Sequence, residues 1–373
     1  MRRRPVTDTA SAVHAVTPPV SDTGSAAPAS SGRRVSWDVI RVLALIEIVL
    51  FHDTYLGPTA EPGIPELPHA WTHTCGASIL IMVSGYFAAV TLRRNPPGRW
   101  LARRFARLLP AYLVAVVVVF AVVKLLSPAE FSLHQLRWTD LVGNLFLMQQ
   151  LLPNVAYVDL SWWTLPVQVA GFTAMALLAS RRVGGRAVMP ILWAVVLVPV
   201  VIREIWMGDH PSVWLVVALE GSGLCMAHLL VAGVAVQRWA SRRLGTVHLA
   251  LLLAAVLVAE KVHPPVTSVA LVGVGLALMC LAARGPDWPL PAVFVTPVRW
   301  IAARSYGIYL MHQSIGYLLE DRLARLGCPS WIWVTGAVLA AGLLGWGLTA
   351  WVERPAYNTL LRVITRSRTL APG

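Results

Sequence analysis

The chain has 373 residues, of which 57% are apolar and only 13% are charged, whereas soluble domains carry about 25% charged residues. The apolar residues come in runs of about 15 to 25, the length that crosses a hydrocarbon core. This composition excludes an ordinary soluble domain and predicts an all-α, polytopic membrane helical bundle. The net charge of +13 could suggest nucleic-acid binding. However, the basic residues lie between the apolar runs, where membrane topology explains them, so we expect no nucleic-acid partner.

The chain begins with a segment over residues 1–35 that is rich in Ala, Ser, Thr and Pro. It lacks the apolar core that a signal peptide has behind its positive start, and we predict a disordered cytoplasmic tail. The membrane domain is expected over residues 36–353 and a cytoplasmic C-terminal tail over residues 354–373. Both tails are too short to bury a core of their own, so we expect the membrane domain to contain the whole activity.

The apolar runs predict about ten transmembrane helices. A shorter segment over residues 140–152 contains Asn144, Gln149 and Gln150, and we expect it to form a re-entrant or interfacial helix. Residues 284–304 are predicted to form a Pro-rich loop. The predicted spans cover residues 37–56, 75–92, 108–126, 162–180, 188–203, 212–236, 246–260, 266–283, 305–319 and 331–352.

Lysine and arginine are distributed unequally over the two sides that ten spans define. The segments on the side of the termini carry 24 of them, and the loops on the opposite side carry five. Because cytoplasmic loops carry an excess of Lys and Arg, this split predicts that both termini are cytoplasmic. We expect a multi-pass protein of the plasma membrane.

The first predicted span contains three ionisable residues, Arg41, Glu47 and His52. Such groups at membrane depth are costly and indicate functional sites. Arg41 and His52 are eleven positions apart, so on a helix they share one face at a separation of roughly 16 Å. Glu47 lies on another face, and we expect it to pair with another span. The alternative for Arg41 and His52 is a pair of interfacial residues, with the arginine snorkelling to the membrane surface.

The four cysteines have no metal-binding spacing, and we expect no metal site. Cys225 and Cys280 fall inside apolar runs and are expected to be packing residues. Cys75 and Cys328 are both predicted on the non-cytoplasmic side, where a disulfide between them could form.

Several motifs together resemble the acyltransferase-3 family of integral membrane O-acyltransferases. The resemblance extends over roughly residues 37–357, and the motifs follow the order that the family has. They are Asp38-x-x-Arg41 followed by His52, the stretch from Gly76 to Ser84-Gly85-Tyr86, the basic segment from Arg103 to Tyr112, Trp163-Thr-Leu-Pro-Val-Gln168, Ser305-Tyr-Gly-Ile-Tyr309-Leu-Met-His312 and Glu353-Arg-Pro355.

This resemblance implies a transfer of an acyl group from cytoplasmic acyl-CoA to a hydroxyl on a saccharide, an envelope polymer or a secondary metabolite. Acyl-CoA is a co-substrate here, and no bound cofactor is expected. We expect its phosphates to contact arginines on the cytoplasmic side, because guanidinium groups bind phosphate. These arginines are Arg41, Arg103, Arg104 and Arg107. For Arg104 and Arg107 a purely topological role is an equal alternative.

His52 is the predicted catalytic residue. Its imidazole could take the proton of the acceptor hydroxyl as general base, or it could attack the thioester and form an acyl-imidazole. The two mechanisms stay open. Weaker candidates for substrate contact are Ser84, Trp163, Gln168, Tyr309 and His312, of which His312 could equally be a structural histidine.

The chain departs from the family pattern at two places. Ile40 and Val42 flank the first arginine where members usually have Gly, and Gln168 replaces a usual Glu. If that Glu tunes a base, its role is empty here or belongs to Glu47 or Asp53; if it only forms hydrogen bonds, Gln168 can replace it.

Two other classes of function compete with the enzyme. A transporter or exporter of a small molecule or lipid-linked saccharide also has many spans and intramembrane charges, although no internal repeat is evident. A non-catalytic scaffold would leave Arg41 and His52 unexplained. The acyl chain, the acceptor and the oligomeric state are not specified by the sequence.

Overall fold

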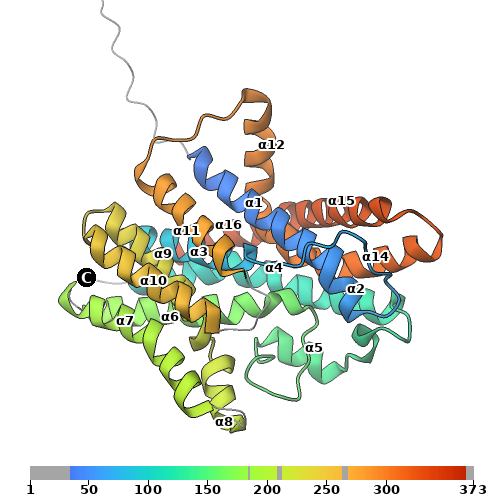
Figure 1. Cartoon of the computed structure of the whole chain (residues 1–373), viewed down its shortest axis with the longest axis horizontal. Helices are drawn as coiled ribbons and strands as arrows, with labels where there is room; N and C mark the ends of the chain where they lie inside the picture. Colours follow the sequence, from blue (N-terminus) through green and yellow to red (C-terminus); the bar gives the residue numbers. More distant parts are fainter. Residues whose placement is uncertain (1–33, 184, 208–211, 263–267, 367–373) are drawn as a thin grey trace, which may run out of the picture. The chain divides into compact units, whose positions relative to one another are not determined.

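The structure, a computed structural model, describes residues 34–183, 185–207, 212–262 and 268–366, and these are almost entirely helical (Figure 1). The predicted N-terminal tail lies almost wholly outside the described residues. The α-helices are α1 (Val35–Phe51), α2 (Gly57–Ala60), α3 (Gly76–Leu92), α4 (Pro97–Leu126), α5 (Trp138–Leu145), α6 (Thr164–Ser180), α7 (Gly185–Ile202), α8 (Val213–Val216), α9 (Ala227–Ala240), α10 (Thr246–Val262), α11 (Val269–Arg284), α12 (Ala292–Ala302), α13 (Ser305–Met311), α14 (Gln313–Arg325), α15 (Ser330–Leu348) and α16 (Arg354–Arg366).

Among the described residues, four helices are long and apolar enough to cross a membrane. They run over Pro97–Leu126, Leu160–Ser180, Ala187–Ile205 and Ser330–Thr365. A fifth crossing results if Val213–Gly221 and Leu224–Ala240, which meet at a bend of 46°, form one span. The all-helical membrane bundle is therefore confirmed, while the count of about ten spans stays a prediction.

Each of the ten predicted spans nevertheless overlaps a helical segment, and the short α5 lies at the expected polar stretch. Three segments differ from expectation. The loop predicted over residues 284–304 contains α12, which begins directly after Pro291, because proline is tolerated at a helix start. The ninth span is interrupted at His312, between α13 and α14. The predicted C-terminal tail begins with α16, which packs against α4.

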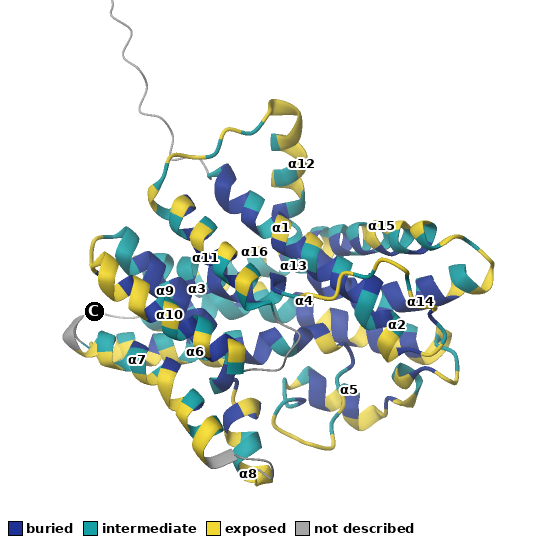
Figure 2. Cartoon of the chain, in the orientation of Figure 1, coloured by how far each residue is buried: buried dark blue, intermediate teal, exposed yellow. Residues whose placement is uncertain are grey.

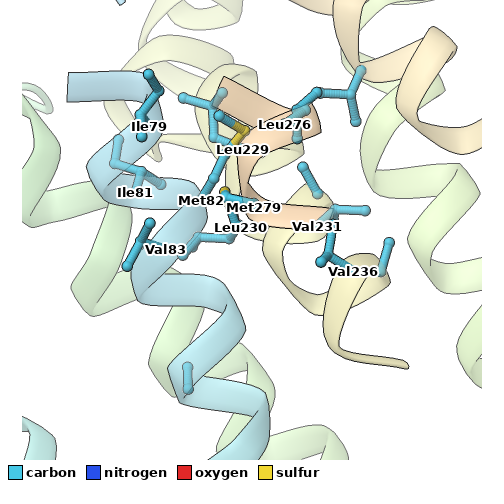
Figure 3. Packing of buried hydrophobic residues seen from close by; sticks show 14 of the residues in the cluster. Ile79, Ile81, Met82, Val83, Leu229, Leu230, Val231, Val236, Leu276 and Met279 are labelled. Atoms are coloured by element: carbon cyan, nitrogen blue, oxygen red, sulfur yellow. The ribbon is translucent and has the colours of Figure 1, made fainter. Parts of the chain in front are cut away.

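Two apolar clusters form the interior, and α1 contributes to both of them. One cluster joins α3, α9 and α11 (Figure 3) and receives Trp37 and Ile40 from α1. The other joins α4, α13 and α15 and receives Leu45 and Ile48. The helix that carries Arg41 and His52 thus lies at the seam between the clusters.

The α3 and α9 helices approach each other more closely than ordinary side chains allow. A Cβ atom added at Gly85 would lie 2.5 Å from the carbonyl oxygen of Leu230, and one added at Gly233 would overlap the backbone of Met82. Glycine at these crossings lets the two backbones touch, as small residues do between membrane helices. This contact fixes the position of α3, which carries Ser84 next to Gly85.

Segments predicted to share the non-cytoplasmic side lie together in the structure. Arg325 of α14 pairs with Glu130, which precedes α5, and Glu61 accepts hydrogen bonds from Ser132. The backbone N–H of Ser268 donates to the carbonyl of Thr74 at 2.9 Å. These contacts bring the segments together, while the side of the membrane on which they lie stays a prediction.

All four cysteines are free, so the suggested pairing of Cys75 with Cys328 is wrong. Cys75 is buried at the start of α3, whereas Cys328 precedes α15. Large apolar side chains are exposed on the outer faces of α7 and α15 (Figure 2), for example Val198 and Leu339. Apolar exposure of this kind suits helices that face lipid tails.

Candidate functional site

A cavity of about 420 Å³ lies where α1, α3, α4, α6 and α13 meet. Its volume is in the range of sites for organic ligands. Four arginines line it, and no carboxylate appears among the described residues of its wall. The structure therefore brings together the four arginines that were predicted to bind the donor: Arg41, Arg103, Arg104 and Arg107. A site of this charge suits an anionic ligand.

Arg104 is held in place on three sides. Its guanidinium carbon lies 5.5 Å from the ring centre of Trp100 and 5.1 Å from that of Phe172. Its Nη2 donates a hydrogen bond of 2.9 Å to the hydroxyl of Thr91. Trp100 belongs to the same helix, α4, whereas Phe172 belongs to α6 and Thr91 to α3. Because all three partners are fixed by the fold, the planar group is oriented before any ligand binds.

Each of the other three arginines has a partner of its own. Arg41 lies over the ring of Phe87 at 4.7 Å and forms an ion pair of 3.3 Å with Asp38. Arg103 donates to Asn95 at 2.8 Å. The exposed Arg107 forms an ion pair of 3.7 Å with Glu353, which connects the basic segment to the last motif.

Ser84 and Gln168 meet in the wall of this cavity. The Ser84 hydroxyl donates a hydrogen bond of 2.9 Å to the amide oxygen of Gln168. A glutamate would offer an acceptor oxygen at the same place, so the observed role is one that Gln168 fulfils by hydrogen bonding. Glu47, one of the two residues suggested to take over the role of the usual glutamate, has other partners, because it accepts hydrogen bonds from the backbone of Gly76 at 2.6 Å and from Trp71 at 3.1 Å.

The inner end of the cavity is formed by Thr164 and Tyr309. The two hydroxyl groups are 2.9 Å apart, and the Tyr309 hydroxyl also donates to the carbonyl of Ser161. Tyr309 is buried and oriented by both contacts. It therefore marks the boundary between the cavity and the interior behind it.

Behind Tyr309 lie the two histidines. The ring of His312 stacks on that of Tyr309 with centres 5.8 Å apart, and the ring of His52 lies 4.9 Å from that of His312. The Nδ1 of His312 lies 2.8 Å from the carbonyl of Tyr309. Both imidazoles are buried, and neither Nδ1 of His52 nor Nε2 of His312 has a hydrogen-bond partner in the described structure.

Local backbone irregularities place both histidines. His52 begins a π-helical turn, His52–Leu56, that widens the helix between α1 and α2, and such turns are frequent at functional sites. His312 stands at the break between α13 and α14, and α14 packs against the π-helical turn. The two interruptions meet and bring the rings into contact.

Two carboxylates are buried in the segments that follow the histidines, Asp53 in the π-helical turn and Glu320 in α14. The sequence did not single out Glu320. The side chains of Asp53 and Glu320 are buried, and all four of their oxygens lack hydrogen-bond partners among the described residues. A Cβ atom added at Gly316 would lie 3.4 Å from Oδ1 of Asp53. Glu320 follows Gly316 by four residues, so it lies on the same face of α14.

The cavity does not include every predicted site residue. Arg41, Ser84, Gln168, Tyr309 and the basic segment of α4 line it, whereas His52, His312 and Trp163 do not. Trp163 packs against the first apolar cluster instead. The sequence analysis did not predict other residues of the wall, because their contacts come from folding rather than from a local pattern. Polar examples are Thr91, Asn95, Tyr306 and Tyr357.

A comparison with known families matches most of the chain. A family model described as an acyltransferase domain matches residues 34–351. The chain belongs to the acyltransferase-3 family. Its members are membrane acyltransferases, and the match contains α1, the basic segment of α4 and both histidines. Comparisons with curated proteins and with solved structures found no match.

Proposed function

We propose that this membrane acyltransferase takes its acyl group from acyl-CoA and transfers it to a hydroxyl group of a saccharide, an envelope polymer or a secondary metabolite. The observation that carries the proposal is the arginine-lined cavity with Tyr309 and the two histidines behind its inner end. Arginine binds phosphate groups through paired hydrogen bonds. The phosphates of coenzyme A would lie at the arginines, and the thioester would extend toward Thr164 and Tyr309.

The chemistry requires one proton transfer. The acceptor oxygen attacks the thioester carbonyl carbon, the carbon–sulfur bond breaks, and the thiolate of coenzyme A leaves. The hydroxyl proton passes to an imidazole and then to the thiolate, so the enzyme returns to its starting state. Holding the two substrates together can itself lower the barrier by about 7–11 kcal/mol.

We expect His52 to take the proton of the acceptor hydroxyl rather than to attack the thioester. It does not line the donor cavity, because Tyr309 and His312 lie between. This arrangement favours general-base catalysis over an acyl-imidazole intermediate. The ring nitrogens of His52 and His312 that lack partners are the groups available to accept the proton.

The alternative function is transport of a small molecule or a lipid-linked saccharide. Buried ionisable groups such as Asp53 and Glu320 also occur in carriers. The family match and the arginine-lined cavity favour transfer of an acyl group.

The test is transfer of a labelled acyl group from acyl-CoA by the purified full chain, with mass spectrometry of cell-envelope glycans and secreted metabolites to identify the acceptor. The wild type should consume the thioester, and His52→Gln should lose about 10²–10⁴-fold in rate, while coenzyme A binding is retained. Thioester consumption that is equal in both proteins would contradict the assignment of His52. Solute movement across vesicles without thioester consumption would support the transporter.

A further inference from the structure

A second cavity, of about 460 Å³, lies between α3, α6, α7 and α9. Its wall is almost entirely apolar and includes Val167, Gly171 and Ala174 of α6. The donor cavity uses Gln168 and Phe172 of the same helix. The two cavities therefore share a helix as a wall but present different faces of it to their contents.

This second cavity opens at the surface that faces lipid. Ala174 and Leu178 line it and are exposed. The helices α6 and α7 belong to segments long and apolar enough to cross a membrane. Only 17% of the most apolar part of Ala187–Ile205, which contains most of α7, is buried. A cavity that opens between such helices is reached from the hydrocarbon region of the bilayer. Its natural content is a hydrocarbon chain.

One end of the cavity is strongly basic. Arg93, Arg238 and Arg243 line it at the ends of α3 and α9. The Nε of Arg238 is buried and has no hydrogen-bond partner, and none of the three forms an ion pair with a carboxylate among the described residues. Guanidinium groups bind phosphate in bidentate geometry. An apolar slot that ends in unpaired arginines therefore has the polarity of an anionic lipid.

We propose that this cavity is a binding site for an anionic phospholipid of the bilayer. An acyl chain lies along α6 and α9, and the phosphate contacts Arg93, Arg238 and Arg243. Basic pockets between membrane helices bind anionic headgroups in this way. The proposal does not depend on the donor or on the reaction, because none of these residues belongs to the donor cavity.

The acyl arm of the donor and a lipid-linked acceptor fit less well. The two cavities share no lining residue, and Gln168 and Tyr309 line only the other one, so a donor held by Arg104 would not reach this cavity directly. A lipid-linked acceptor would place its saccharide at the arginines, away from the histidines. Both are outcomes that the test distinguishes.

The test measures binding of phosphatidylglycerol and phosphatidylcholine with identical acyl chains to the purified full chain, by native mass spectrometry. The wild type should retain phosphatidylglycerol in preference. The double variant Arg93→Gln/Arg243→Gln should weaken phosphatidylglycerol binding by on the order of tenfold. The matched control Arg94→Gln/Arg181→Gln removes two exposed arginines that do not line the cavity and should bind as the wild type does.

Ala174→Trp fills the slot with a large side chain and should reduce the binding of both lipids, while the arginines are unchanged. Its thermal unfolding and acyl transfer are compared with those of the wild type to confirm that it folds. Equal retention of the two lipids by the wild type would overturn the proposal, as would equal losses in the two double variants. Displacement of phosphatidylglycerol by acyl-CoA or by a polyprenyl phosphate, but not by other phospholipids, would assign the cavity to a substrate instead.

Discussion

The imidazole rings of His52 and His312 lie 4.9 Å apart, although they come from the first and the ninth predicted spans. Each stands at an interruption of its helix, and the second ring stacks on Tyr309 at the inner end of the arginine-lined cavity. The contact connects the arginine-lined cavity to a buried histidine that does not itself line it.

If both rings belong to one path for the proton, the effects of substituting them on the rate of acyl transfer should not be additive. His52→Gln and His312→Gln should each lower the rate of acyl transfer by about 10²–10⁴-fold, and the double variant should be little worse than either single one. His248→Gln alters an exposed histidine of α10 and should leave the rate unchanged. The measurement is the initial rate at matched expression. Multiplied losses in the double variant would show that the histidines act separately.

The affinity of the arginine-lined cavity for coenzyme A should depend on the planar shape of the guanidinium groups as well as on their charge. Arg104→Lys keeps the charge but loses stacking on Trp100 and Phe172, so we expect coenzyme A affinity to fall about tenfold. Arg99→Lys is the control, because Arg99 lies on the same helix outside the cavity. Calorimetry in detergent gives both affinities. An unchanged affinity for Arg104→Lys would remove it from the donor site.

The sequence predicted the parts of the site that depend on local pattern. Long apolar runs identified the helices. The shared face of Arg41 and His52 follows from the fixed period of a helix and stays a prediction. The expectation that Glu47 pairs with another span is confirmed, since it accepts a hydrogen bond from the backbone of Gly76 at the start of α3. These inferences require only neighbours along one helix.

Contacts between distant segments could not be predicted in the same way. The proximity of Asp53 to α14 depends on how two helix interruptions pack together, and no spacing in the sequence encodes that. Trp163 was expected to contact substrate because it belongs to a motif, but it packs against the core. The helix α12 was not predicted, because Pro291 precedes it and Pro297 lies within it, and prolines in a sequence favour a loop.

The carboxylate of Asp287 should make the stability of the first helix depend on pH. Its two oxygens accept hydrogen bonds of 2.9 Å from the backbone N–H groups of Val35 and Ser36, the first residues of α1. Partial burial raises the pKa of Asp287, but the hydrogen bonds from Ser36 and Val35 outweigh it and leave that pKa below its ordinary value. The stabilisation is therefore complete above the ordinary pKa, about 4, and is lost as the pH falls through the lower folded value.

Asp287→Asn should destabilise the protein at neutral pH by about 1 kcal/mol, as loss of a helix cap does. The difference from wild type should shrink below about pH 4. Thermal unfolding in detergent over this pH range measures it. Glu66→Gln, at an exposed loop position, should show no such difference. A destabilisation that is constant down to pH 3 would mean that the charge of Asp287 is not involved.

The membrane topology is predicted from the unequal distribution of basic residues. Cysteine-labelling reporters at Pro96 and Ala240 should read cytoplasmic, and reporters at Pro62 and Leu326 should read external. The reason is the 24 to five division of Lys and Arg between the two sets of segments. Reporters at Pro96 and Ala240 that read on opposite sides would contradict the ten-span arrangement and the cytoplasmic donor site.

Substitutions of Gln168 can show what the glutamate that is usual at this position in the family does. In the structure its amide oxygen accepts the hydrogen bond of Ser84, and a carboxylate oxygen can do the same. Gln168→Glu should therefore keep acyl transfer within a few-fold. Gln168→Leu leaves the Ser84 hydroxyl without its acceptor, which costs about 1–3 kcal/mol, and should lower the rate or the stability accordingly. Ser84→Ala in the Leu background removes the orphaned hydroxyl and should recover part of that loss. The measurements are initial rates and thermal unfolding of the four proteins. A Gln168→Glu variant as inactive as His52→Gln would show that the neutral amide itself, and not its acceptor oxygen, is required in this chain.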